Sequence, residues 1–143
     1  MEQTTSRLEL TDHLVTLFKN TPSELIDKVI YLIQGKIRPD YEGIELGIAE
    51  KMIIRIISQI SNISNVEVYH KYRELGDLGS VAETILKYKV QKTLFNEKVT
   101  IEGIYLIFDK ISKTTGKGSQ DIKLRLLASL FNDSSPVECK YII

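Results

Sequence analysis

GIAEKMIIRIISQIS, residues 47–61, decides the fold class of this chain. Its apolar residues recur at intervals of three and four, which is the spacing of one face of an α-helix. Further isoleucines fill the other sides, a pattern typical of a helix buried at the centre of a domain. The many β-branched residues would also suit a strand, but the length of the run and its spacing favour a helix.

Helical patterns continue on both sides of this segment. The first predicted helix covers about 8–19, and residues 35–47, with Pro39 and three glycines, form a connection. Apart from the helix at 47–61, each later helix follows a residue whose side-chain oxygen can cap a helix N-terminus: Thr21, Ser64, Asp77, Thr100, Ser119 and Ser135. Thr-Pro-Ser-Glu at 21–24 and Ser-Pro-Val-Glu at 135–138 share the order of cap, proline and glutamate, which is a weak hint of duplication.

The sequence therefore predicts an all-α fold of packed helical hairpins, with residues 1–143 as one domain. The core is expected to include Ile53, Ile56, Ile57, Ile104, Phe108, Leu127 and Leu130. The last helix runs into three apolar residues at 141–143 with no C-cap, so we expect the domain to continue beyond Ile143.

Composition and charge exclude several classes of protein. The content of 43% hydrophobic and 27% charged residues is ordinary for a globular domain, and no apolar run is long enough to span a bilayer. Cys139 is the only cysteine and the two histidines are distant in sequence, which excludes a Cys/His zinc cluster and favours a reducing, cytosolic-type compartment. The net charge is zero, but residues 1–70 hold seven basic and ten acidic residues and residues 71–143 hold twelve and nine, giving −3 and +3.

The most informative polar segment is TGKGSQ, residues 115–120. It is not a nucleotide phosphate loop, because the spacing before Gly-Lys is wrong and a helix precedes it. Two glycines nevertheless allow close backbone approach, and a helix beginning at Ser119 presents free N–H groups to an anion. Lys117 and Lys123 add positive charge, so a DNA phosphate would fit. An ordinary helix–loop–helix turn remains the alternative.

The basic stretch KYKVQK, residues 87–92, is a second candidate for phosphate contact. It contains no acidic residue, and its lysines could touch a DNA backbone without reading bases. The alternative is a solvated helix end whose lysines compensate the helix dipole. No catalytic arrangement of Ser/His/Asp or Cys/His type is recognisable in the chain.

Three separated motifs carry a resemblance to a known family: ELGIAE at 45–50, ELGDLGSVAE at 74–83 and TTGKGSQD at 114–121. Together they resemble the N-terminal domain of ATP-dependent DNA ligases, most closely the archaeal branch and also the eukaryotic replicative enzymes. The resemblance implies a non-catalytic, all-α domain that contacts the backbone and minor groove of nicked duplex DNA without sequence preference. It also implies a role in replication, repair and recombination.

The resemblance assigns DNA contacts to particular residues. The backbone-contacting turn corresponds to Gly116, Lys117, Gly118, Ser119 and Gln120, with Lys123, expected to be exposed, on the helix that follows. The comparable helix start in the first half carries Gly47 and Lys51, and the region where relatives are also basic carries Lys87, Lys89 and Lys92.

Adenylation in this family belongs to a following domain with a Lys-x-Asp-Gly nucleophile motif, and that motif does not occur in these residues. ATP and Mg²⁺ are accordingly expected as cofactors of a full-length enzyme and not of this part. The expected partners are nicked DNA, the catalytic domains of the same chain and, as a further candidate, a sliding clamp, but no membrane. The expected location is the cytoplasm, or the nucleus for a eukaryotic source.

Two other functions stay open on the sequence. A helical protein–protein interaction module would suit the neutral charge and the apolar end of the chain, and it predicts no salt-dependent DNA binding. A small enzyme of unrecognised type predicts a polar pocket with perturbed titratable groups.

Overall fold

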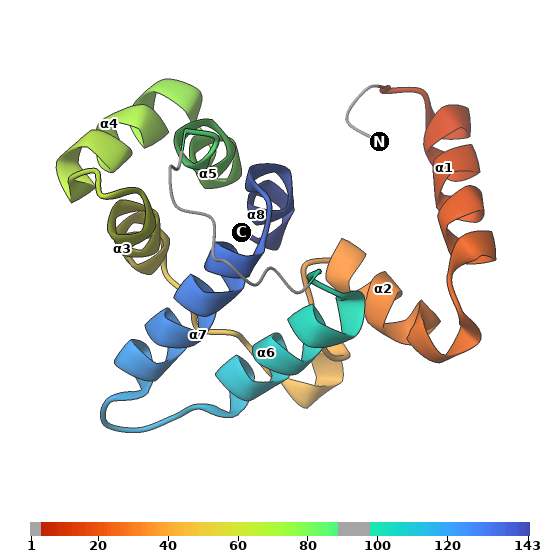
Figure 1. Ribbon diagram of the computed structural model, residues 1–143. Helices are drawn as coiled ribbons and strands as arrows, with labels where there is room; N and C mark the ends of the chain where they lie inside the picture. Colours follow the sequence, from red (N-terminus) through yellow and green to blue (C-terminus); the bar gives the residue numbers. More distant parts are fainter. Residues whose placement is uncertain (1–3, 89–97) are drawn as a thin grey trace. The chain divides into compact units, whose positions relative to one another are not determined.

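The structure, a computed structural model, describes residues 4–88 and 98–143. All regular elements within these two ranges are helical, so the predicted all-α class is confirmed. The α-helices shown in Figure 1 are α1 Arg7–Asn20, α2 Ile26–Ile33, α3 Glu50–Ser61, α4 Asn65–Leu75, α5 Leu78–Leu86, α6 Ile101–Lys113, α7 Ser119–Asp133 and α8 Pro136–Ile142. None of the described helices is both long and apolar enough to cross a membrane.

The chain divides into two compact units, Met1–Gly43 and Ile44–Ile143. In the first unit α1 buries no residue, and the apolar side chains that are buried, Val29 and Ile37, come from α2 and the segment after it. The connection after α2 contains a short 3-10 turn at Asp40–Glu42, which Arg38 braces by an ion pair to Glu42 at 3.4 Å.

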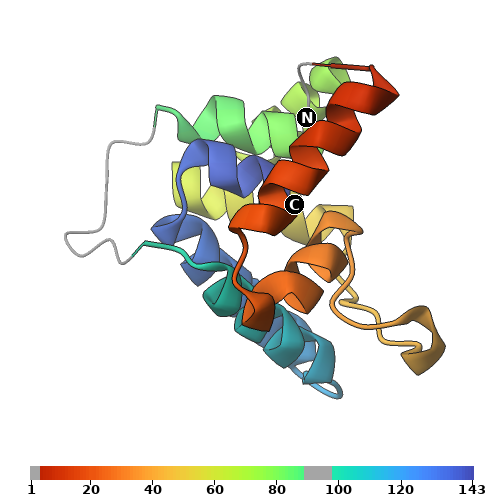
Figure 2. The same cartoon turned by 90° about the vertical axis from the view of Figure 1, so that its right-hand side faces the viewer.

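The second unit is built around α3, as the isoleucine-rich segment predicts. Helices α4, α5 and α7 all contact α3, α8 lies beside α5, and α6 and α7 form a hairpin (Figures 1 and 2). Ile56 and Ile57 are completely buried at the centre, together with Val81 from α5 and Ile111 from α6. Of the predicted core residues all are buried except Ile104, which is half-buried.

Helix α5 packs closely on α8 because Gly79 has no side chain. A Cβ atom at Gly79 would overlap the carbonyl oxygen of Lys140. The two helices are therefore held at a separation that only glycine permits at this position. An ion pair between Lys140 and Glu83 at 3.5 Å joins the same two helices.

Four predicted N-caps are confirmed by hydrogen bonds. Ser64 and Ser135 each form a full capping box with a glutamate three residues later. Asp77 accepts from the amide of Ser80 at 2.7 Å, and Thr100 accepts from the amide of Gly103 at 3.1 Å.

The predicted cap at Thr21 is wrong. Its hydroxyl donates to the carbonyl of Leu17 at 2.7 Å, so it ends α1 instead of starting α2. A 3-10 turn, Ser23–Leu25, stands between Pro22 and α2, and no side chain caps it. The resemblance between 21–24 and 135–138 thus does not extend to their local structures.

Helix α3 also begins later than predicted. Gly47 has a φ of 60°, a left-handed conformation that cannot continue an α-helix, and Ala49 is still extended. The first helical residue is Glu50.

Candidate nucleic-acid interface

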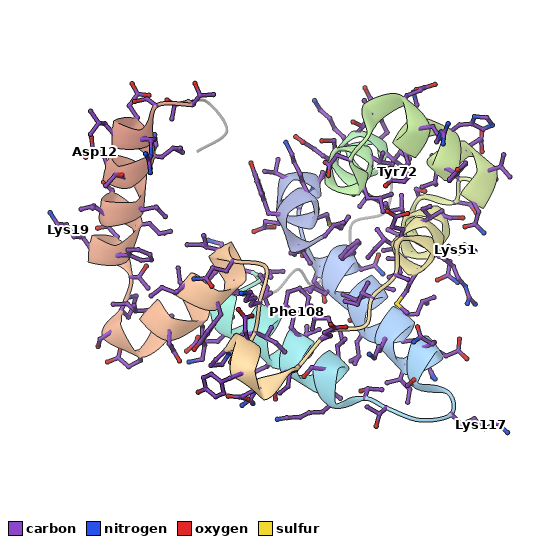
Figure 3. All side chains as sticks on the ribbon, turned by 180° about the vertical axis from the view of Figure 1, so that it is seen from behind. Asp12, Lys19, Lys51, Tyr72, Phe108 and Lys117 are labelled. Atoms are coloured by element: carbon purple, nitrogen blue, oxygen red, sulfur yellow. The ribbon has the colours of Figure 1, made fainter. Side chains whose placement is uncertain are left out.

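The loop between α6 and α7 exposes its backbone. Gly116 and Gly118 have φ values of 87° and 83°, and a Cβ added at either one would meet no atom within 4 Å. Lys117 stands between them at the tip of the loop, and its side chain points away from the protein in Figure 3. A ligand can therefore approach this backbone directly, beside a positive charge.

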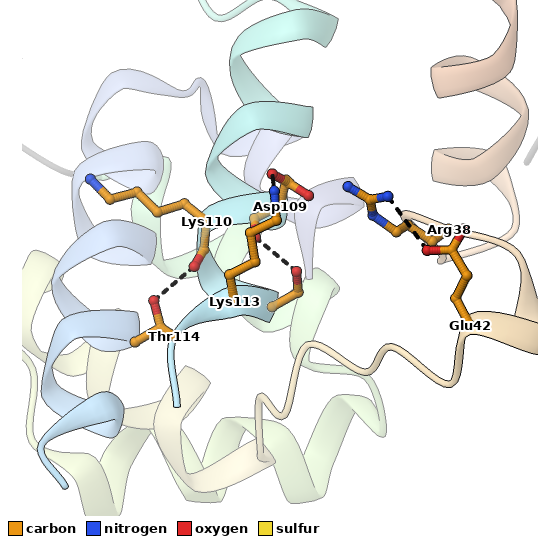
Figure 4. A network of polar contacts seen from close by, with 7 residues as sticks. Arg38, Glu42, Asp109, Lys110, Lys113 and Thr114 are labelled. Carbon is orange, nitrogen blue, oxygen red and sulfur yellow. Dashed lines mark hydrogen bonds and ion pairs between the residues drawn. The ribbon is translucent and has the colours of Figure 1, made fainter. Parts of the chain in front are cut away.

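The C-terminal end of α6 fixes the other side of this loop. Thr114 donates to the carbonyl of Lys110 at 2.7 Å, and Lys113 pairs with Asp109 at 2.5 Å (Figure 4). Both bonds satisfy groups within the last turn of α6. These contacts fix the C-terminal end of α6, where the loop with Gly116 and Gly118 begins.

The start of α7 differs from the sequence prediction in its cap. Gly118 occupies the N-cap position, and Ser119 is the first helical residue with its amide donating to the carbonyl of Gly116 at 3.2 Å. No side chain caps this end of the helix. The amides of Gln120 and Asp121 have no intrahelical acceptor, because the first residues of any α-helix lack one. The helix dipole places partial positive charge at the same point.

Lys123 is buried, and the expectation that it is exposed is wrong. It is 6% exposed, and its Nζ donates to the carbonyl of Leu46 at 2.6 Å. The reason lies in its position on α7, one turn before Leu127 on the face that packs into the core. The helical spacing of Lys123 with Leu127 and Leu130 was a signal for burial that the sequence already contained.

The Gly47 turn is therefore tied to α7. A Cβ at Gly47 would lie 3.0 Å from the Nζ of Lys123, so the lysine reaches the turn where glycine leaves room. The structure thus brings the predicted helix start at Gly47 against the helix that follows the Gly116–Gly118 loop. The buried ammonium group of Lys123 therefore connects the Gly47 turn to the helix after the Gly116–Gly118 loop, although the two segments are far apart in sequence.

Lys51 lies on the first turn of α3 and is exposed (Figure 3). Its neighbour Glu50 accepts a hydrogen bond from the hydroxyl of Tyr72 at 3.0 Å, which joins the start of α3 to α4. That bond, reinforced by the charge of Glu50, raises the pKa of Tyr72.

A groove between α3 and α7 was missed by the sequence analysis. Two arginines border it, Arg55 from α3 and Arg125 from α7, and its volume is about 660 Å³. The available signal was the spacing of Lys51, Arg55 and Gln59, which places three polar residues in one row along α3.

The basic stretch at 87–92 is only partly within the described ranges. Lys87 follows the end of α5 and is exposed. Lys89 and Lys92 lie outside the described residues, so their assignment as DNA contacts stays a prediction.

Comparison with known proteins identifies the family. Residues 1–143 match the family model described as DNA ligase N terminus. Among curated relatives, a DNA ligase of Nitrosopumilus maritimus is 51% identical over 143 residues, and one of Cenarchaeum symbiosum is 46% identical over the same length. A protein of Korarchaeum cryptofilum described as DNA ligase 2 is 40% identical over 142 residues.

The matches cover 99–100% of this chain but only 24% of each of these three relatives. The chain thus spans about a quarter of the length of the proteins it resembles. Because both the family model and these relatives cover essentially every residue, the chain belongs to the DNA ligase N-terminal family.

Proposed function

We propose that this chain is the non-catalytic DNA-binding part of an ATP-dependent DNA ligase, which holds duplex DNA around a nick for catalytic domains elsewhere in the protein. The observation that carries the proposal is the α6–α7 loop, where two left-handed glycines and Lys117 lead into an uncapped helix N-terminus. Because the chain belongs to a DNA ligase family, DNA is the anionic ligand that we expect this loop to bind.

Phosphate is the part of DNA that this loop suits. Open backbone amides and a helix dipole favour an anion without regard to the base attached to it. Binding should therefore be independent of sequence, as a ligase that acts at any nick requires. The Gly47 turn and Lys51 form a second contact in this proposal, held in place through Lys123.

The remaining parts of the proposal concern the whole protein. Adenylate transfer, with ATP and Mg²⁺, belongs to segments outside these 143 residues, because the nucleophile motif Lys-x-Asp-Gly is not in the chain. Replication, repair and recombination are the processes in which nicks arise, and a sliding clamp is a further candidate partner. A cytoplasmic location is part of the same proposal, with the nucleus in its place for a eukaryotic source.

The test is fluorescence anisotropy with a labelled nicked duplex at several salt concentrations. The wild-type chain should bind weakly, in the nonspecific range of about 10⁻⁴ to 10⁻⁶ M at physiological salt, and with a negative log–log salt slope. Lys117→Ala should make that slope shallower by about 0.9, since one phosphate contact is lost.

Lys71→Ala on α4 is the matched control, because Lys71 is an exposed lysine in an ion pair with Glu74 and lies on another helix. It should leave the slope close to that of the wild type. Undetectable binding of the wild-type chain at low salt would overturn the proposal. Equal slopes for Lys117→Ala and the wild type would remove the α6–α7 loop from the interface.

A protein–protein interaction module is the second candidate function. Val137 and Tyr141 lie one turn apart on α8 and are 53% and 64% exposed, which leaves an apolar strip on the surface of this helix. This function predicts that the chain shows no salt-dependent DNA binding. The same titration therefore separates the two candidates.

A further inference from the structure

The groove between α3 and α7 is bordered by two rows of polar side chains. On α3 the row is Arg55 and Gln59, one helical turn apart. Arg125 and Asn132 border it from α7, and Leu124 and Ala128 contribute apolar surface to its lining. The groove therefore presents two guanidinium groups, two amide groups and the carboxylate of Asp121.

The arginines are only lightly engaged by the protein itself. Arg55 is 3.9 Å from the carboxylate of Asp121, with side chains 56% and 69% exposed, and such exposed pairs are weak. Arg125 uses its Nε for the carbonyl of Asp121 at 3.3 Å. That bond leaves the terminal nitrogens of its guanidinium for another acceptor.

The groove adjoins the start of α7, one of the two helix starts of the proposed interface. At one end Asp121 is in the first turn of α7, directly after the Gly116–Gly118 loop. On α3, Lys51 is one turn before Arg55 and follows the Gly47 turn in sequence. Arg55 and Arg125 therefore line the groove together with Asp121, a residue of the first turn of the helix that follows the glycine loop.

We infer that this groove binds a phosphate group of the DNA backbone through Arg55 and Arg125, a site additional to the glycine loop; the inference rests on the proposed function. Guanidinium groups suit phosphate because their planar donors can bind two oxygens at once. Gln59, which also lines the groove, supplies a neutral donor. Asp121 competes with the phosphate for Arg55, so it weakens binding at this site.

The experiment compares arginine variants of the same chain on the same labelled nicked duplex. In the double variant Arg55→Met and Arg125→Met, the salt slope should become shallower by about 0.9, because the contact with one phosphate is lost. Arg73→Met, which removes an exposed arginine from the last turn of α4, is the matched control and should leave the slope near the wild-type value. Circular dichroism melting curves establish that the variants are folded.

Asp121→Asn provides an independent test, because this variant should strengthen DNA binding where the arginine variants weaken it. It should bind the duplex several-fold more tightly than wild type at low salt, and the gain should shrink as salt rises. Asp133→Asn, at the other end of α7, is the control and should show no comparable gain.

The outcomes separate this inference from the proposed function. If the wild type binds and Lys117→Ala flattens the slope, but the double arginine variant behaves like Arg73→Met, the groove inference is overturned while the proposed function stands. The groove would then be open to a different anionic partner, such as an acidic peptide. If the wild-type chain itself fails to bind, the proposed function and the inference fall together.

Discussion

Lys123 carries a positive charge at a position where α7 otherwise buries leucine. Taking an ammonium group out of water is unfavourable unless a hydrogen-bond acceptor replaces the water. The carbonyl of Leu46 does so at 2.6 Å, and the same Nζ lies beside Gly47, where a Cβ atom would come within 3.0 Å of it. One side chain therefore fixes the turn that precedes α3.

Lys123→Ala should lower the free energy of unfolding by about 2–4 kcal/mol, because a charged hydrogen bond and buried packing are lost together. Lys117→Ala should change it by less than about 0.5 kcal/mol, since Lys117 is exposed at the loop tip. Urea unfolding followed by circular dichroism measures both. If the two variants lowered the free energy of unfolding by similar amounts, the hydrogen bond from Lys123 to Leu46 would contribute little to stability.

Asp77 gives the molecule a stabilising interaction that depends on pH. The amide of Ser80 donates to its carboxylate, and this hydrogen bond holds the pKa of Asp77 below the ordinary value of 3.8. The folded state therefore prefers the ionised form more than the unfolded state does. The stabilisation is complete above about pH 5 and is lost as pH falls through 3.8 toward the lower folded-state pKa.

Asp77→Asn should consequently flatten the acid side of the stability profile. Asparagine caps a helix about as well as aspartate, so the variant should match the wild type within about 0.5 kcal/mol near neutral pH. Below pH 4 it should lose less stability than the wild type. Thermal melts between pH 3 and pH 7 provide the comparison, and parallel profiles would contradict the role assigned to the carboxylate.

At the scale of whole elements, the sequence predicted features that depend on residues close together in the chain. The caps at Ser64, Asp77, Thr100 and Ser135 depend on residues no more than three positions away, so the pattern alone identified them. Thr21 failed because its hydroxyl was already bonded to Leu17 in the preceding helix.

Contacts between distant elements were beyond the same reasoning. The groove that places Arg55 beside Asp121 exists only because α3 and α7 pack together. The bond from Lys123 to Leu46 likewise spans seventy-seven positions, and no spacing within one helix indicates which carbonyl a buried lysine will reach.

The close packing of α5 on α8 predicts that replacing a helical glycine with alanine destabilises the protein. Gly→Ala in the interior of a helix normally stabilises a protein by about 0.5–1 kcal/mol. At Gly79 the added methyl group would overlap the backbone of Lys140, and overpacking of this kind costs about 1–3 kcal/mol. Gly79→Ala should therefore be destabilising.

Thr84→Ala on the same helix is the comparison for this effect. Thr84 is exposed, so its replacement should be neutral or slightly stabilising through helix propensity. Melting temperatures of the two variants decide the matter. If Gly79→Ala melts at or above the wild-type temperature, α5 and α8 can separate without cost and are less tightly fixed than their contact indicates.

At the scale of the whole chain, binding and chemistry are expected to be separate. This chain matches 24% of the length of each of the three DNA ligases named above. Those relatives are therefore about four times as long as this chain. The polar features described in the second unit are suited to phosphate contact: glycine loops, an open helix start and arginines at a groove. This arrangement predicts that the chain has no part in forming the adenylate.

Incubation with ATP and Mg²⁺ tests that separation directly. A covalent adenylate on lysine needs a nucleophile held against the α-phosphate and a pocket for the nucleotide. Lys117 stands at an exposed loop tip, its side chain points away from the protein (Figure 3), and it does not line the groove between α3 and α7. Intact-mass measurement should therefore find only the unmodified chain, and nicked DNA should stay unsealed. The full-length Nitrosopumilus maritimus relative, treated in parallel, controls for the reagents, and a lysine–AMP adduct on this chain would place part of the catalytic chemistry within these 143 residues.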